Sequence, residues 1–249
     1  MRKQRLGLRP VAVHEWLQLD EALLEHKRSV LRRAYAQAVA EVPEFKPPDV
    51  SALSLTMADS YPHWIANLAS QIAEDVCVLD VRDRQRLVAG CVTAPSYWSL
   101  LDKMGQPLRE VHQPVQGLNR KLGASIERFI ARMPEGQPFR RDNWFVHGGQ
   151  ALMRTRGETA AELGENPARW FVRSEQQGLY KPDGRHLLFT IRVVQVPLQD
   201  IFSYSEARND LLQTLAAMDA DEVEHFGGVA KHALLTDYVA RGMQAREEA

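Results

Sequence analysis

The chain has 249 residues with 45% hydrophobic side chains, and its 31 lysines and arginines are balanced by 32 aspartates and glutamates. Apolar residues in this proportion can fill the core of one large domain. A formal net charge of -1 gives no electrostatic basis for binding nucleic acid or an anionic membrane surface. No apolar run approaches the roughly 20 residues that span a bilayer, and no secretory signal follows the basic N-terminus.

The two cysteines, Cys77 and Cys91, stand in apolar runs and lack the spacing of a metal-binding pair. We expect both to be buried free thiols in a reducing compartment, which places the protein in the cytoplasm. The sequence shows no internal repeat and no low-complexity tract. A single domain over residues 1–249 is therefore expected.

The N-terminal half alternates between helical and extended patterns. Apolar residues recur at helical spacing over residues 17–40, Asp20 is placed to cap that helix, and Pro43, Pro47 and Pro48 end it. Further along, the patterns predict a helix, two strands joined by a polar turn, a short helix, a loop and another helix. These segments are residues 61–74, 76–81 and 86–93, 95–104, 108–115 and 118–133.

The C-terminal half begins with strands and ends with helices. Strands are predicted at residues 143–153, 169–180 and 186–197, and helices at 205–218, 221–226 and 229–243. The apolar stripes of these helices can pack on the core or on a second subunit of a homo-oligomer, and we expect the core. Together the elements predict an α+β fold: an antiparallel sheet of about five strands flanked by helices. Residues 1–48 would be a helical N-terminal extension and 205–249 a helical C-terminal segment.

Motifs for nucleotide binding and for serine-type nucleophiles are absent from the sequence, and its eight histidines lack the spacing of a protein-only metal centre.

Glu175 lies in a predicted strand with Trp170 and Phe171. Alternation along the strand favours a solvent-facing Glu175, whereas a buried carboxylate there could act as an acid or base. Asn143 and Trp144 follow Arg141, and their donors could together grip a carboxylate; a core tryptophan at a strand start is the alternative.

Several segments, taken together in their order and spacing, resemble the haem-dependent oxidative N-demethylase family. They are Pro95-Ser96-Tyr97-Trp98, Asp102-Lys103-Met104-Gly105-Gln106-Pro107-Leu108, Val111-His112-Gln113-Pro114-Val115, Arg141-Asp142-Asn143-Trp144, Arg173-Ser174-Glu175-Gln176-Gln177-Gly178-Leu179 and Leu188-Phe189-Thr190-Ile191-Arg192. The opening Gly7-Leu8-Arg9-Pro10, with Trp16 and Asp20 after it, and Glu74-Asp75-Val76-Cys77-Val78-Leu79 also fit. The resemblance covers about residues 7–200. Each motif alone is weak, and the ordered set is more specific.

The resemblance implies a PAS-like fold in which haem b lies against an antiparallel sheet. It implies a monooxygenase that uses O₂ to remove a methyl group from a small amine such as dimethylamine, releasing formaldehyde. The electrons would come from NADPH through a separate reductase that carries flavin and an iron–sulfur cluster. This fits a chain that has no nucleotide-binding fingerprint of its own.

The resemblance also assigns roles to individual residues. His112 would be the axial iron ligand, because a neutral imidazole is a good donor to haem iron. Glu175 would be the catalytic carboxylate of the distal pocket, where it binds the substrate ammonium or relays protons. The propionates and the pocket wall would involve Arg141, Arg173, Arg192, Asn143 and Trp144. If His112 is not the ligand, His63, His147 and His186 are next in line.

The sequence departs from the family pattern in two of these segments. Gln116 stands where the family has the second proline of Pro-Val-Pro, and Gln176 and Gly178 stand where it has arginine and threonine. The lost arginine removes a charge and the glycine would loosen its strand, so a different amine or an N-oxygenation fits as well. Two other hypotheses remain open: a non-catalytic haem-binding or haem-sensing module, which needs no distal carboxylate, and a haem-free amine-binding domain.

Overall fold

The computed structural model of the chain describes residues 7–55, 57, 59–111, 123–157 and 159–247. Within these residues the fold is α+β, as predicted, with an open seven-stranded sheet in which every neighbouring pair of strands is antiparallel. The strand order is β1-β5-β6-β7-β3-β4-β2. The strands are β1 (Arg9–Pro10), β2 (Val39–Glu41), β3 (Asp75–Asp80), β4 (Arg86–Cys91), β5 (Phe139–His147), β6 (Phe171–Tyr180) and β7 (His186–Pro197).

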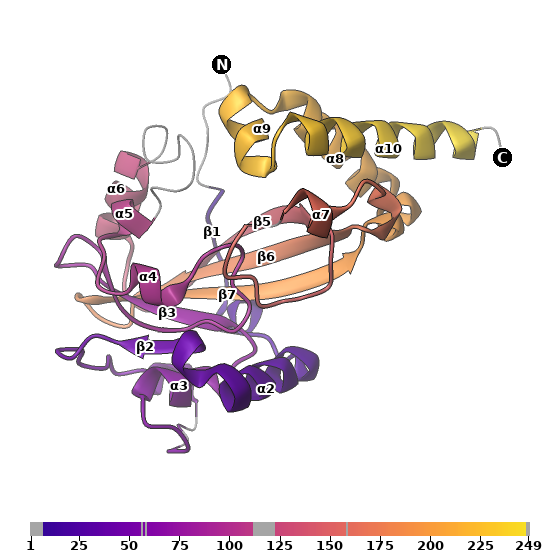
Figure 1. Cartoon of the computed structure of the whole chain (residues 1–249). Coiled ribbons are helices and arrows are strands. Elements are labelled where there is room, and N and C mark those ends of the chain that lie inside the picture. Colours follow the sequence, from indigo (N-terminus) through magenta and orange to yellow (C-terminus); the bar gives the residue numbers. More distant parts are fainter. Residues whose placement is uncertain (1–6, 56, 58, 112–122, 158, 248–249) are drawn as a thin grey trace.

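The helices lie before, between and after these strands (Figure 1). Those of the first half are α1 (Val13–Trp16), α2 (Glu21–Ala38), α3 (Trp64–Ala69), α4 (Leu100–Lys103), α5 (Leu108–Val111) and α6 (Ala124–Arg132). Those of the second half are α7 (Ala160–Leu163), α8 (Ser205–Ala217), α9 (Ala220–Phe226) and α10 (Val229–Glu247). In the part of the chain that the structure describes, no helix is both long and apolar enough to cross a membrane.

Cross-strand register decides which side chains share a face of the sheet. Asn143 of β5 is paired with Glu175 of β6, which is paired with Val193 of β7, so these three residues project to the same side. We call this side the site face. Residues one position away, such as Trp144 and Gln176, project to the other side, which we call the opposite face.

The opposite face is covered over β3 and β4 by α2 and α3. The Asp20 carboxylate caps α2 as predicted, accepting a hydrogen bond from the Leu23 N–H at 3.2 Å. Val30 of α2 is fully buried in one core cluster with Val76 and Val78 of β3. Burying each such side chain contributes about 1.5–3 kcal/mol, which holds α2 on the sheet.

The C-terminal helices cover the opposite face at its other end, over β5 and β6. Figure 1 shows α8, α9 and α10 together on the β5 side of the molecule, away from α2 and α3. Their buried residues form one cluster with Val146 and Trp170: Leu211, Leu215, Phe226, Leu235 and Val239. The prediction that these helices pack on the core is therefore confirmed for these positions.

The site face is covered by shorter elements. Leu100 of α4 lies so close to Gly90 of β4 that a Cβ at that position would collide with it at 2.6 Å. Phe129 of α6 packs edge-on against Phe139 of β5, with 5.1 Å between ring centroids. Residues 93–97 and 148–154 complete the cover and meet at a bridge between Ser96 and Arg154. Loops rather than long helices therefore enclose the polar part of this face.

Several predicted elements differ from the structure in extent. The helix predicted at residues 61–74 is only α3, because residues 70–74 turn toward β3. Residues 108–111, predicted as a loop, form the single turn α5, and the helix predicted at 118–133 is described only from Ala124 as α6. The strand predicted at 143–153 begins at Phe139 and ends at His147. The next residue, Gly148, lies so close to the backbone of Leu163 that a Cβ there would collide with it.

Two strands were not predicted at all. β1 and β2 are two and three residues long, too short to show any period, and both lie in the segment expected to be a helical extension. They form the two edges of the sheet, so this segment contributes strands as well as helices. Cys77 and Cys91 are buried free thiols, as expected, and burial raises the pKa of both, that of Cys91 to about 12.

Candidate functional site

Polar side chains interrupt the apolar site face in the middle of the sheet. Glu175 is paired across β5 with Asn143, and the adjacent rows on the same face place Gln177 beside Arg141 and Arg173 beside Phe145. Glu175 is only 6% exposed, so the solvent-facing orientation favoured by the strand pattern is wrong. The buried alternative, which permits acid–base chemistry, is the one that the structure shows.

The Glu175 carboxylate is held at both oxygens. Ser96 Oγ donates to Oε1, and Gln177 Nε2 donates to Oε2 at 2.8 Å. Each carboxylate oxygen can accept about two hydrogen bonds, so one further acceptor site remains on each. The bonds from Ser96 and Gln177 therefore leave Glu175 able to accept from a further N–H donor.

Arg173 is fully buried and its two terminal nitrogens are committed to the protein. Nη2 donates to the Ala94 carbonyl at 2.5 Å and Nη1 to the Leu152 carbonyl at 3.0 Å. Burial lowers the pKa of Arg173, and the charge of Glu175 counteracts that effect. This arginine therefore neutralises Glu175 and fixes the two covering loops, which leaves it poorly placed to bind a propionate.

Arg141 differs from Arg173 because its guanidinium makes no hydrogen bond to any residue that the structure describes. Burial lowers the pKa of Arg141, and the charge of Glu175 again counteracts this. A desolvated arginine without a hydrogen-bonded partner favours an anionic ligand, because an unpaired buried charge is costly. Arg141 is therefore the arginine on the site face best suited to a carboxylate group.

Tyr97, which is half-buried, and His147, which is buried, form a pair on the same face. The Tyr97 backbone has a φ of 67°, a left-handed conformation that is rare for a bulky residue, and its hydroxyl is hydrogen-bonded to Nδ1 of His147. His147 is fully buried, and its Nε2 has no hydrogen-bond partner among the described residues.

His147 is a neutral imidazole. Burial, together with the charges of Arg154, Arg173 and Lys231, lowers its pKa to about 2. A neutral imidazole with an unpartnered nitrogen has the chemistry of a metal ligand. Of the alternative ligands His63, His147 and His186, His147 is the one whose strand position lies on the site face beside Phe145.

The other two alternative histidines are placed elsewhere. His63 caps the start of α3 and is hydrogen-bonded through Nδ1 to the Tyr35 hydroxyl at 3.1 Å. His186 begins β7 and is hydrogen-bonded to the Asp183 carboxylate at 2.9 Å. Val193, the partner of Glu175, lies seven positions after His186 in β7, a distance of roughly 23 Å along a strand.

The predicted axial ligand, His112, lies outside the described residues, as does Gln116. The chain immediately before it is described: Val111, the last residue of α5, packs in one cluster with Phe129, Phe139 and Phe189. Phe139 and Phe189 flank Leu179 on the site face, one row from Gln177. Residue 111 is therefore anchored on the same face as Glu175.

Two predicted site residues are not brought together with Glu175. Trp144 lies on the opposite face and packs edge-on against Phe226, 6.0 Å between ring centroids. Arg192 also lies on the opposite face, where its Nη2 donates to Asp20 at 2.8 Å and its Nη1 to Gln18 at 2.9 Å. The strand positions of Arg141, Asn143, Arg173 and Glu175 share the site face.

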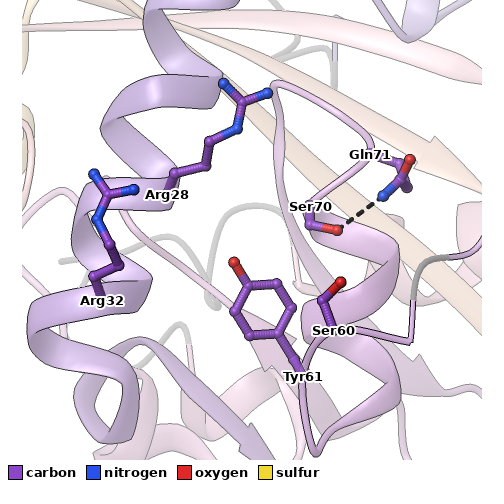
Figure 2. A pocket seen from close by; sticks show the side chains of 6 residues that line it. All are labelled: Arg28, Arg32, Ser60, Tyr61, Ser70 and Gln71. Carbon is purple, nitrogen blue, oxygen red and sulfur yellow. Dashed lines mark hydrogen bonds between the residues drawn. The ribbon is translucent and has the colours of Figure 1, made fainter.

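An open surface pocket of about 490 Å³ lies on the far side of α2 from this cluster. Figure 2 shows it between α2 and the segment that carries α3, lined by Arg28, Arg32, Ser60, Tyr61, Ser70 and Gln71. Arg28 pairs with Glu21 at 2.6 Å and Arg32 pairs with Glu25 at 3.0 Å, so both positive charges are already balanced within α2. This pocket offers no reactive group, and we do not assign the function to it.

Sequence reasoning missed the residues that hold Glu175 and His147. Ser96 and Tyr97 belong to one of the segments that carry the family resemblance, yet neither received a role. The same holds for Asp75 in another segment, which binds Thr93 and Ala94 of the loop that carries Ser96. Gln177 follows Glu175 by two positions, which is the spacing of same-face neighbours in a strand. The two motifs and that spacing are the signals that would have pointed to them.

The comparisons with known proteins agree with the motif resemblance. No curated protein matches the chain. The family described as haem-dependent oxidative N-demethylase, alpha subunit-like, matches residues 49–230, which include β3 to β7 and the whole cluster around Glu175. Because the match covers most of its length, the chain belongs to this haem-dependent oxidative N-demethylase family.

Proposed function

We propose that the chain binds haem b on the site face, in the manner of a PAS-like haem protein, and oxidises a small amine with O₂. The observation that carries the proposal is the buried Glu175, held by Ser96 and Gln177 beside Arg141. The haem supplies the activation of O₂ with electrons from a separate NADPH-dependent reductase.

The residues of the site face fit a haem. Arg141 is half-buried without a hydrogen-bond partner among the described residues and suits one propionate. His112 is the proposed axial ligand, and the neutral His147, with its unpartnered Nε2, is the other imidazole available to iron. Haem binding would thus have a cationic side chain for a propionate and an imidazole nitrogen for the iron.

The role of Glu175 follows from its charge balance. A propionate bound by Arg141 would cancel one positive charge and leave the Glu175 carboxylate opposed by Arg173 alone. An alkylammonium group could then donate N–H bonds to the free acceptor sites of Glu175. The carboxylate would hold the amine and take its proton, since an unprotonated amine nitrogen is the form that is oxidised.

The overall reaction balances for an N-methylamine. One oxygen atom of O₂ ends in formaldehyde and the other in water. Two electrons and one proton come from NADPH through the reductase, and a second proton comes from solvent. The C–N bond to the methyl group breaks, and the nitrogen gains a hydrogen in its place. Oxygenation at nitrogen is the alternative for the same site.

A non-catalytic haem-binding module remains the second candidate. The observation that favours it is that both oxygens of Glu175 already accept a hydrogen bond and Arg173 already balances its charge. Such a module would bind haem without needing the amine.

The test is turnover by the haem-loaded protein supplied with a surrogate NADPH-dependent reductase. Methylamine, dimethylamine and trimethylamine are the substrates, and formaldehyde is the product measured. We expect formaldehyde from wild type with at least one amine and at least a tenfold lower rate from Glu175→Gln. Glu162→Gln, which removes an exposed carboxylate paired with Arg156, is the matched control and should retain the rate. Haem binding without any amine oxidation would favour the non-catalytic module.

A further inference from the structure

A chain of hydrogen bonds connects the first residue of β3 to Glu175. Asp75 is 3% exposed and its two oxygens bind two consecutive residues of the segment after β4. Thr93 Oγ1 donates to Oδ1 at 2.7 Å, and the Ala94 N–H donates to Oδ2 at 2.7 Å. We call residues 93–97 the strap.

The strap in turn holds two charged side chains of β6. The Ala94 carbonyl accepts from Arg173 Nη2 at 2.5 Å, and Ser96 Oγ donates to Glu175. Three consecutive residues, beginning at Ala94, thus set the positions of both the carboxylate and the guanidinium that balances it. Asp75 is linked to the proposed catalytic group through them, and its charge also raises the pKa of Arg173.

The remaining strap contacts leave it little freedom. The Thr93 carbonyl is hydrogen-bonded to His26 Nε2 at 3.0 Å. The Arg154 N–H donates to the Pro95 carbonyl at 3.1 Å, and the Tyr97 N–H donates to the Arg154 carbonyl at 2.7 Å. The Asp75 bonds fix the end of the strap nearest β4, and residue 154 fixes the other end.

We propose that Asp75 is a positioning residue that sets the amine affinity of Glu175 through Thr93, Ala94 and Ser96. The proposal rests on the proposed function, because it concerns the same carboxylate. A buried carboxylate is expensive to desolvate, and an apolar contact would anchor a loop at lower cost. What the carboxylate adds is geometry: two directed bonds to neighbouring residues hold the Ser96 hydroxyl against Glu175.

A substitution at Thr93 can remove one hydrogen bond between Asp75 and the strap with little change in side-chain shape. Thr93→Val keeps the shape of a buried side chain and removes only the hydroxyl that donates to Asp75, while Thr93→Ser keeps the hydroxyl. Asp75→Asn is the second variant: it removes the charge, and its one amide oxygen can replace only one of the two accepting carboxylate oxygens. Asp80→Asn is the matched control: Asp80 is a buried carboxylate at the other end of β3, bonded to Arg185 at 2.9 Å.

The experiment is calorimetric titration of dimethylamine into haem-loaded protein, with the unfolding midpoint of each variant measured alongside. We expect Thr93→Val and Asp75→Asn to weaken binding about fivefold or more, as the loss of one hydrogen bond implies, and Thr93→Ser to stay within about twofold of wild type. Asp80→Asn should lower the unfolding midpoint without changing affinity.

Three results would overturn the proposal. Unchanged affinity in Thr93→Val and Asp75→Asn would show that the strap does not act on Glu175. Equal weakening in Asp80→Asn would show that the effect follows general stability. A wild type that binds none of methylamine, dimethylamine and trimethylamine, seen before any variant is made, would count against an amine site at Glu175 and so against the proposed function itself.

Discussion

The Ser96 hydroxyl donates a hydrogen bond to Glu175, a residue 79 positions later in the chain, and so joins the covering strap to the centre of the sheet. Neighbouring Tyr97 makes the same kind of connection to His147. Two consecutive loop residues thus control a carboxylate and an imidazole on adjacent strands.

The Tyr97 hydroxyl is predicted to stabilise the fold as well as the site. Tyr97→Phe keeps the ring and leaves the buried Nδ1 of His147 without its partner, which should lower the free energy of unfolding by about 1–3 kcal/mol. Urea denaturation of the haem-free protein measures this. Tyr204→Phe, at an exposed tyrosine, is the control and should be neutral. An equally neutral Tyr97→Phe would mean that the pair contributes nothing to stability.

His147 should make stability depend on pH. Its pKa is lowered to about 2 in the folded chain, whereas an unfolded histidine titrates near 6.5. The unfolded state therefore binds more protons between these values, so stability is full above about pH 6.5 and is lost as pH falls. The contribution of this group to the slope is at most about 1.4 kcal/mol per pH unit.

The measurement is urea denaturation of wild type and His147→Asn from pH 6.5 down to pH 4.5. The variant, which does not titrate, should lose less stability than wild type over this range. Parallel curves would show that His147 is not held neutral by its surroundings.

Gly178 is predicted to be required for the docking of Trp16. A Cβ at residue 178 would collide with the Trp16 indole, whose Nε1 donates to Thr190 Oγ1 at 2.7 Å. Gly178→Ala should therefore cost about 1–3 kcal/mol and alter Trp fluorescence. Trp16→Ala should remove only part of that penalty, because Thr190 Oγ1 also lies against the added Cβ, so Gly178→Ala should cost less in the Trp16→Ala background than in wild type. Additive losses would contradict the steric explanation.

Lys27 is predicted to be a structural cation rather than a reactive amine. Its buried Nζ donates to the carbonyls of Ala69, Ile72 and Glu74 at 2.9, 2.6 and 2.6 Å, and burial lowers its pKa. Lys27→Met leaves these carbonyls unpaired and should lower the free energy of unfolding by about 3 kcal/mol. Lys46→Met, at an exposed lysine, is the control. A variant as stable as wild type in thermal denaturation would refute this role.

The fold was predictable where a pattern is long and local. The α2 helix with its Asp20 cap, the β6–β7 hairpin and the C-terminal helices follow from periodicity and turn residues. The edge strands β1 and β2 were not predictable, because a strand of two or three residues exists only through its pairing with a neighbour. Gly178 was interpreted as loosening its strand, and only the packed structure shows that it admits Trp16.

The site was predictable only where local strand alternation decides which residues share a face. Alternation alone separates Asn143 from Trp144, since adjacent residues of a strand cannot line one pocket, and the structure places them on opposite faces. The burial of Glu175 depends on a strap that is distant in sequence, and no local pattern reports it. The availability of Arg141 and the engagement of Arg173 likewise depend on which loops cover each residue.

The most direct test of the account is a haem titration followed by the Soret absorption band. Wild type, His112→Ala, Arg141→Gln and His147→Asn are compared at equal protein concentration. We predict one haem bound per wild-type chain, a lost or shifted band in His112→Ala, about tenfold weaker binding in Arg141→Gln and a retained band in His147→Asn. No Soret band in wild type would contradict the central claim, and a band that survives in His112→Ala but is lost in His147→Asn would move the iron ligand to His147.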